Sequence, residues 1–227
     1  MSEVKRLDVL KQDTQRLAGQ KTRIKVCGLK RPEDIESVNL AKPDFCGFIV
    51  EFPKSSRCVS RQLLTELTAE LDPQIIPVGV FVNAPVELPA ELAKIGVIRA
   101  IQLHGQEDEE YIRQLRELAG TDVPVIQAFS IKTMEDLRRA EKSSADHILL
   151  DQGSGGTGKT FDWSLAEDFA RPFILAGGLG TDNLAEAIGR LSPWAVDLSS
   201  SLETDGVKDR EKIIEAVNIV RSCGQCV

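Results

Sequence analysis

The chain has 227 residues, a formal net charge of −7 and an isoelectric point of about 5.1. Because it has no basic stripe and only one Tyr and two Trp to stack on bases, we do not expect nucleic acid as a partner. No apolar run approaches the roughly 20 residues of a membrane span, and the N-terminus lacks the apolar core of a signal peptide, so we expect a cytoplasmic protein without membrane contact.

Residues 1–22 come first and stand apart from the pattern of the rest of the chain. Leu7, Leu10 and Leu17 are spaced to mark one face of a short helix, which would cover one end of the fold. A solvated, frayed tail explains the same residues equally well. The sequence leaves both interpretations of this N-terminal extension open.

From residue 23 onward, short apolar and β-branched runs alternate with stretches of helical periodicity. The expected strands are 23–28, 44–50, 75–82, 100–105, 124–131, 147–151, 173–178 and 194–200. Each is followed by a helical pattern, with Pro32 in the first turn of the first helix and Gly120 ending a later one. Eight such units, about 25 residues apart, predict an α/β fold: a single-domain (β/α)8 TIM barrel over residues 23–227.

The five cysteines and two histidines do not suggest a metal site or a disulfide framework. Cys223 and Cys226 form a C-x-x-C at the end of the chain, where a redox pair between a strand and a helix is not expected. His104 and His147 have no partner at ligand spacing. We therefore expect no metal and interpret the C-x-x-C as incidental.

Polar residues end most of the expected strands, on the side of the barrel where such folds carry their chemistry. Any one of them is unremarkable alone, since strands end near water, but together they predict a site. The set comprises Cys27, Glu51, Asn83, His104, Ser130, Asp151, Gly177, Gly178, Asp197, Ser199 and Ser200.

Three loops poor in side chains follow the last three strands. "GSGGTG" at 153–158, "AGG" at 176–178 and "SSS" at 199–201 leave backbone N–H groups free to converge on an anion. The loops after strands seven and eight are the recurrent phosphate site of these barrels. We therefore predict phosphate binding by Gly155, Gly156, Thr157, Gly158, Gly177, Gly178, Ser199 and Ser200.

Several motifs, in order from about Ile24 to the last helix, resemble the phosphoribosylanthranilate isomerase family. They are "KVCGLKRPED", "SSR", "GVFVN", "QLHG", "LLD…GGTGKTFDW", "LAGGL" and "DLSS" with "GVKD". The resemblance implies an enzyme of tryptophan biosynthesis that performs an Amadori rearrangement without a cofactor. Its small-molecule substrate, N-(5-phosphoribosyl)anthranilate, becomes 1-(2-carboxyphenylamino)-1-deoxyribulose 5-phosphate. Whether the chain is a monomer or a homodimer stays open.

The resemblance also assigns the acid and the base. It implies that Cys27 is the general base and Asp151 the general acid, at the ends of strands one and six. Lys25 precedes Cys27 by two residues and shares its face, so we expect its ammonium to favour the thiolate. We expect burial beside Leu149 and Leu150 to keep Asp151 protonated.

Four further residues are expected to contact the substrate. The resemblance implies that Arg57 grips the anthranilate carboxylate, for which its planar fork is suited. Gln102 and His104 are given a supporting role in the pocket, although His104 fits equally well as a residue of the barrel wall. Asp197 is directed at a substrate hydroxyl or at the anthranilate nitrogen, with a purely structural role as the alternative.

The chain departs from the family pattern in two places. After the last strand it has "SSSLE" where the family has "SSGVE", so that Ser201 and Leu202 replace a glycine and a β-branched residue. The segment "FIVEFPKSSRCVS" also lacks the usual aromatic residue and "SPR". We expect these changes to affect substrate contacts and not the type of reaction.

Two alternative functions fit part of this sequence pattern. A related sugar-phosphate isomerase of histidine biosynthesis performs the same rearrangement with two aspartates, whereas strand one here ends in Cys27. A non-catalytic barrel that binds a phosphate ligand would keep the glycine-rich loops but would not need both Cys27 and Asp151. Neither alternative accounts for these residues as well as the resemblance to the phosphoribosylanthranilate isomerase family does.

Overall fold

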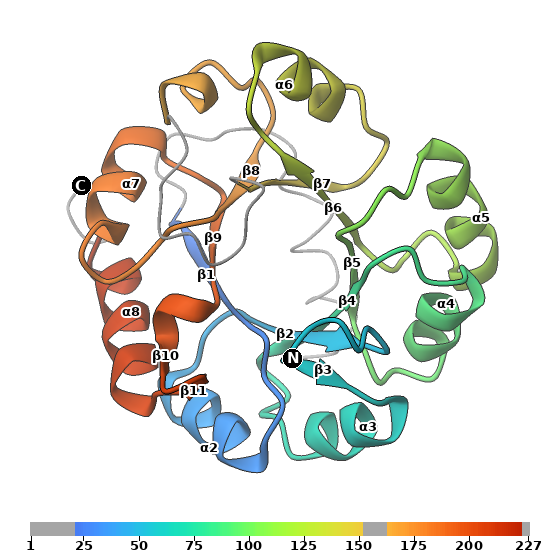
Figure 1. Cartoon of the computed structure of the whole chain (residues 1–227), viewed down its shortest axis with the longest axis horizontal. Coiled ribbons are helices and arrows are strands. Elements are labelled where there is room, and N and C mark those ends of the chain that lie inside the picture. The colour runs from blue at the N-terminus through green and yellow to red at the C-terminus, as the bar shows by residue number, and fades with distance from the viewer. Residues whose placement is uncertain (1–20, 152–162, 224–227) are drawn as a thin grey trace.

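The computed structural model describes residues 21–151 and 163–223, and its main sheet closes into a barrel (Figure 1). Neighbouring strands are parallel, and the pairing of β1 with β2 closes the ring. The predicted (β/α)8 barrel and its single domain are confirmed. The barrel strands are β1 (Arg23–Cys27), β2 (Phe45–Val50), β4 (Ile76–Phe81), β5 (Ala100–Leu103), β6 (Val125–Ser130), β7 (His147–Asp151), β8 (Phe173–Ala176) and β9 (Ala195–Leu198).

Helices form the outer ring around these strands (Figure 1). They are α2 (Pro32–Ala41), α3 (Arg61–Ala69), α4 (Glu87–Lys94), α5 (Glu109–Ala119), α6 (Met134–Glu141), α7 (Leu184–Leu191) and α8 (Arg210–Cys223). As predicted, Pro32 lies in the first turn of α2, where its missing N–H costs no hydrogen bond, and Gly120 follows the end of α5 with a φ of 87°.

Between β7 and β8 the expected α-helix is not found among the described residues. They form only a 3₁₀ turn, η1 (Trp163–Ala166). Pro172 lies shortly after this turn and disfavours helical geometry in the residue before it, so a helix has no room to continue toward β8. The prediction of a helix here was wrong for the described part of the segment.

Two short pairings were not predicted. β3 (Cys58–Val59) lies beside β2, and β10 (Glu203–Thr204) pairs antiparallel with β11 (Val207–Lys208). Both lie near the carboxyl ends of the barrel strands. β3 follows Arg57 directly and pairs with the end of β2, and β10 begins shortly after β9.

Glycines decide where several strands end. The strands expected at 23–28 and 173–178 stop one and two residues earlier, at Cys27 and Ala176. Gly28, Gly177 and Gly178 have φ values of 82°, 84° and 67°, in the left-handed region that a strand cannot include. These glycines therefore turn the chain at the mouth of the barrel.

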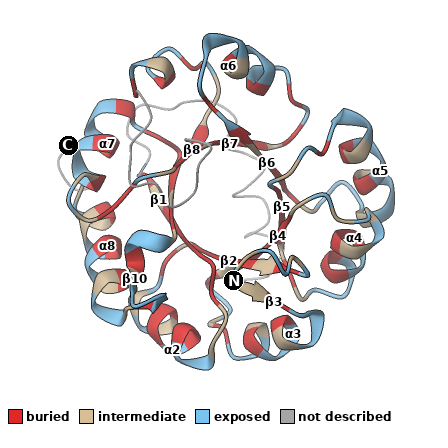
Figure 2. Ribbon diagram, viewed as in Figure 1, coloured by how far each residue is buried: buried red, intermediate tan, exposed pale blue. Residues whose placement is uncertain are grey.

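Apolar side chains fill much of the barrel interior. The cluster comprises Phe45, Val78, Ala100, Ile126, Leu149, Ile174, Ala176, Trp194 and Ala195. A larger buried cluster joins the outer faces of the strands to the helices, and Figure 2 shows the buried residues on the strands and on the inward sides of the helices. Cys27 and Asp151 lie at the carboxyl ends of β1 and β7, where the barrel fold predicts the chemistry.

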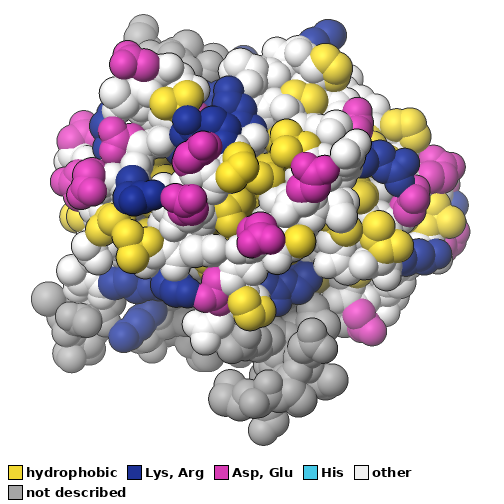
Figure 3. All heavy atoms as spheres, turned by 90° about the horizontal axis from the view of Figure 1, so that it is seen from below, with side chains coloured by type: hydrophobic (Ala, Val, Ile, Leu, Met, Phe, Trp, Pro, Cys, Tyr) yellow, Lys and Arg dark blue, Asp and Glu magenta, His cyan; other side chains and the backbone are white. Residues whose placement is uncertain are grey.

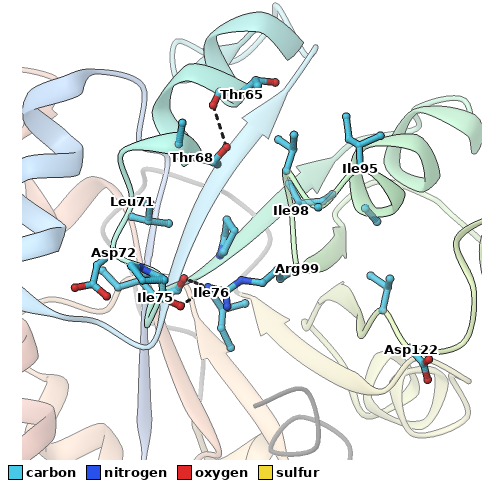
Figure 4. A pocket seen from close by; sticks show the side chains of 17 residues that line it. Thr65, Thr68, Leu71, Asp72, Ile75, Ile76, Ile95, Ile98, Arg99 and Asp122 are labelled. Carbon is cyan, nitrogen blue, oxygen red and sulfur yellow. Dashed lines mark hydrogen bonds between the residues drawn. The ribbon is translucent and has the colours of Figure 1, made fainter. Parts of the chain in front are cut away.

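A cavity lies at the opposite end of the barrel, away from the strand-end residues predicted for the site. It has a volume of about 660 Å³ and lies between the ends of α3 and α4 and the starts of β4 and β5 (Figure 4). Its lining is mostly apolar, including Leu71, Ile75 and Ile98, and Arg99 donates to the carbonyl of Pro73 at 3.1 Å. We do not assign the chemistry to this cavity, because none of the described residues that the sequence predicts for the site lines it.

The outer surface is mixed in charge. On the face shown in Figure 3, Lys and Arg side chains alternate with Asp and Glu, with hydrophobic side chains between them.

Within the described residues, no helix has the length and hydropathy needed to cross a bilayer. Nearly all of the N-terminal extension, together with Cys226, lies outside these residues.

Candidate active site

Cys27 shares the mouth of the barrel with a buried ion pair. Lys25 and Asp197 are register partners on β1 and β9, and Lys25 Nζ donates to Asp197 Oδ2 at 2.9 Å. Their side chains are only 1% and 8% exposed. A Cβ atom placed on Gly47 of β2 would lie 2.7 Å from Cys27 Sγ and 2.8 Å from Lys25 Nζ, so the thiol and the ammonium occupy one space that this glycine leaves open.

The protonation of Cys27 differs from the expectation. Burial raises the pKa of the Cys27 thiol, and Asp197 adds to this, while Lys25 lowers it by a smaller amount. The pKa therefore ends above its ordinary value, and the thiol is the resting form. Burial alone would lower the pKa of Lys25, but Asp197 and Cys27 raise it above its ordinary value, so Lys25 stays a cation. Lys25 is placed as expected, yet it only reduces the effect of burial.

One carboxylate oxygen of Asp197 has no hydrogen-bond partner among the described residues. Burial raises the pKa of this carboxyl group against the effect of Lys25. Its Oδ2 accepts from Lys25, whereas Oδ1 is buried and accepts no hydrogen bond from the described residues. An unsatisfied buried acceptor costs about 1–3 kcal/mol. This atom is therefore the strongest structural support for contact between Asp197 and a substrate.

Asp151 lies near His104, which follows β5 directly and contacts Gln102 of that strand. Its Oδ2 is 3.5 Å from His104 Nε2, and its side chain is 18% exposed. Gln102 Nε2 is 2.9 Å from His104 Nδ1. With the amide placed as a donor, Nδ1 accepts and the imidazole proton lies on Nε2, facing Asp151. His104 and Asp151 both interact electrostatically with Asp197, so the ends of β5, β7 and β9 face a common space.

Arg57 is also at the mouth, with a partner that the sequence analysis did not foresee. Its Nε and Nη2 donate to the two carboxylate oxygens of Glu203 at 2.6 and 2.7 Å. Lys208 Nζ donates to Glu203 Oε1 at 2.8 Å and to the carbonyl of Ser199 at 2.9 Å. The hairpin of β10 and β11 brings Glu203 and Lys208 together. The sequence offered one signal for these two residues: Glu203 ends "SSSLE" and Lys208 lies in "GVKD", and both motifs were already compared with the family.

Half of the predicted phosphate site can be placed. Gly177 and Gly178 follow β8, and Ser199 and Ser200 follow the neighbouring strand β9, so the four are side by side at the mouth. Ser199 Oγ donates to the carbonyl of Cys27 at 3.0 Å, which ties β9 to β1 and uses the hydroxyl proton. Residues Gly155, Gly156, Thr157 and Gly158 lie outside the described residues.

Sequence comparison relates this chain to proteins of one activity. The family described as N-(5'-phosphoribosyl)anthranilate (PRA) isomerase matches residues 24–219. The N-(5'-phosphoribosyl)anthranilate isomerase of Endomicrobium trichonymphae is 46% identical, over 88% of this chain and 98% of that protein. The protein of the same name from Acetivibrio thermocellus is 43% identical, over 88% of this chain and 96% of its own length.

Solved structures give the same result. The phosphoribosyl anthranilate isomerase of Thermotoga maritima is 35% identical with a TM-score of 0.78, covering 88% of this chain and 99% of that one. A phosphoribosyl anthranilate isomerase in complex with reduced 1-(o-carboxyphenylamino)-1-deoxyribulose 5-phosphate is 34% identical, with a TM-score of 0.76 and the same coverage. The chain, with its closed barrel and its strand-end cysteine and aspartate, therefore belongs to the N-(5'-phosphoribosyl)anthranilate isomerase family.

Proposed function

We propose that this chain converts N-(5-phosphoribosyl)anthranilate into 1-(2-carboxyphenylamino)-1-deoxyribulose 5-phosphate, with Asp151 as the general acid and Cys27 as the general base. The observation that carries the assignment is the mouth of the barrel, where Cys27 and Asp151 end β1 and β7. Asp197 interacts electrostatically with both residues. An acid and a base at separate strand ends can act on different atoms of one bound substrate.

The first step is ring opening. Asp151 donates a proton to the furanose ring oxygen, the bond from C1′ to that oxygen breaks, and a protonated Schiff base forms at C1′. Asp151 is partly exposed at the mouth, where it can meet the substrate. His104, held by Gln102, faces the Asp151 carboxyl group and orients it.

The second step is proton removal from C2′. The Cys27 thiolate takes this proton, and the electron pair of the C–H bond moves to neutralise the Schiff base, giving an enolamine. The enolamine tautomerises to the ketone, so that substrate and product have the same atoms. Lys25 stabilises the thiolate that this step requires, and the free Oδ1 of Asp197 is placed to accept from a substrate hydroxyl or from the anthranilate nitrogen.

The two ends of the substrate are bound by different parts of the mouth. The phosphate is bound by the backbone N–H groups of Gly177, Gly178, Ser199 and Ser200, together with the 155–158 loop that the sequence predicts. Arg57 binds the anthranilate carboxylate. We further propose that the protein acts in the cytoplasm on a free small molecule, without a cofactor or a metal, as a monomer or a homodimer.

The proposal is tested by following the loss of fluorescence of freshly prepared phosphoribosylanthranilate. Wild type should turn the substrate over, and Cys27→Ala and Asp151→Asn should each lose at least about 10²-fold in turnover, the lower range for general acid–base catalysis. Cys27→Ala with more than a few per cent of wild-type turnover would exclude Cys27 as the base. A wild type that binds phosphate ligands without turnover would favour the non-catalytic barrel.

A further inference from the structure

Arg57 lies directly above the backbone that follows the proposed base. A Cβ atom on Gly28, the residue after Cys27, would lie only 2.5 Å from Arg57 Cδ. The Arg57 guanidinium also interacts electrostatically with the Cys27 thiol. A carboxylate held by Arg57 would therefore place an attached aromatic amine close to Cys27.

Glu203 occupies only one edge of the Arg57 guanidinium. The contacts at 2.6 and 2.7 Å use the Nε–H and one Nη2–H. A guanidinium has five N–H donors in one plane, so a second edge, formed by Nη1 and the other Nη2–H, can take another carboxylate in a bidentate way. Among the described residues, none accepts a hydrogen bond from Arg57 Nη1.

Glu203 is itself fixed from the other side. Lys208, whose side chain is 1% exposed, donates to Glu203 and to the carbonyl of Ser199 at the end of β9. Burial alone would raise the pKa of Glu203, but the hydrogen bonds from Arg57 and Lys208 outweigh it and lower the pKa to about 2. Glu203 is therefore ionised at neutral pH, and its carboxylate is tied to the barrel itself.

We propose that Glu203 is a positioning residue for substrate recognition, an inference that rests on the proposed role of Arg57. Glu203 holds the Nε edge of Arg57 so that the Nη edge faces the aryl carboxylate of the substrate. An arginine without this partner would lose side-chain freedom when the substrate binds, and that loss would weaken the affinity. Lys208 ties Glu203 to the carbonyl of Ser199, which follows β9, the strand of Asp197.

The opposite role for Glu203 is a competing carboxylate that the substrate must displace from Arg57. The two roles predict opposite signs. Removing a positioning residue weakens binding of a carboxylate ligand, whereas removing a competitor strengthens it. A residue that only stabilises the hairpin of β10 and β11 would affect all ligands of the site equally.

The test compares two stable ligands by calorimetry: reduced 1-(o-carboxyphenylamino)-1-deoxyribulose 5-phosphate and its phenylamino counterpart without the carboxylate. For Glu203→Gln, we expect the Kd of the ligand with the carboxylate to rise about tenfold, as for the loss of one charge-assisted contact. The Kd of the phenylamino counterpart should change by less than about twofold. Glu203→Asp, which keeps the charge, should recover part of the affinity. In turnover of phosphoribosylanthranilate, the change should appear in KM and not in kcat.

Glu167→Gln is the matched control. It removes another glutamate–arginine contact of 2.6 Å, to Arg190, on an exposed surface away from the mouth, and both Kd values should stay at the wild-type level. Equal weakening of both ligands by Glu203→Gln would overturn the proposal in favour of a structural role, and tighter binding would overturn it in favour of competition. If wild type instead fails to turn over phosphoribosylanthranilate, it is the proposed function that fails.

Discussion

Lys25 and Asp197, 172 residues apart in sequence, form a hydrogen-bonded ion pair of 2.9 Å inside the barrel, beside the thiol of Cys27. Removing two charges from water is costly, and such a pair is kept only when its geometry is good. Here the pair does more than join β1 to β9. It shifts the pKa of Cys27, which Lys25 lowers and Asp197 raises, and it leaves Asp197 Oδ1 without a hydrogen-bond partner among the described residues.

The first prediction concerns the pH dependence of turnover. Because burial raises the pKa of Cys27, the thiolate is scarce at neutral pH and its fraction grows as the pH increases. We therefore expect kcat/KM to rise with pH through and above the ordinary thiol pKa of about 8.5. Initial rates across this range measure the rise. A kcat/KM that is flat or falls over the same range would contradict a thiolate base with a raised pKa.

A second prediction concerns Lys25→Met. Loss of the ammonium removes the strongest interaction that lowers the Cys27 pKa, so the alkaline rise of kcat/KM should move to higher pH. Asp197 is left as a buried carboxylate without its partner, and breaking such a pair costs about 3–5 kcal/mol of the free energy of unfolding. Urea denaturation and the pH–rate profile measure the two effects.

The double variant Lys25→Met with Asp197→Asn separates these effects. It removes the unpaired charge, so stability should partly return while turnover stays low. Recovery of wild-type turnover in the double variant would show that the ion pair has only a structural role.

Gly47→Ala tests the space that the thiol and the ammonium share. The added Cβ would lie under 3 Å from both Cys27 Sγ and Lys25 Nζ, so at least one of them must move. Overpacking of this kind costs about 1–3 kcal/mol of stability, and displacement of the base should lower kcat by more than about tenfold. Gly189→Ala is the control, because no atom lies within 4 Å of its added Cβ at an exposed position of α7. It should leave turnover unchanged, and equal effects of the two substitutions would refute the argument.

Gln102→Leu addresses the orientation of His104. The substitution removes the amide that contacts His104 Nδ1 at 2.9 Å, so the imidazole no longer has a fixed tautomer opposite Asp151. We expect kcat to fall several-fold, within about 10²-fold, because His104 orients the acid and does not replace it. Affinity for inorganic phosphate, measured by competition, should not change. A loss of phosphate affinity as large as the loss of kcat would instead indicate general damage to the pocket.

The sequence by itself was sufficient for the architecture of this protein. The alternation of apolar strands and periodic helices is a local property, so the eight barrel strands could be located and their number predicts closure. Pro32 and Gly120 mark helix ends through their own backbone preferences. The same logic put Cys27 and Asp151 among the strand-end residues of the site, because a barrel carries its chemistry at the carboxyl ends of its strands, whereas their roles came from the family resemblance.

The partners of the site residues were decided only by the tertiary structure. Glu203 contacts Arg57 across 146 residues, and no local pattern encodes that pair, because it depends on how a short hairpin folds back over the mouth. The sign of the Cys27 pKa shift is likewise a property of the closed barrel. Lys25 is a neighbour on the same strand, but the burial that outweighs it arises only when the barrel closes around the thiol. Backbone preferences act locally, whereas burial and ion pairing act between residues that only the packed fold brings together.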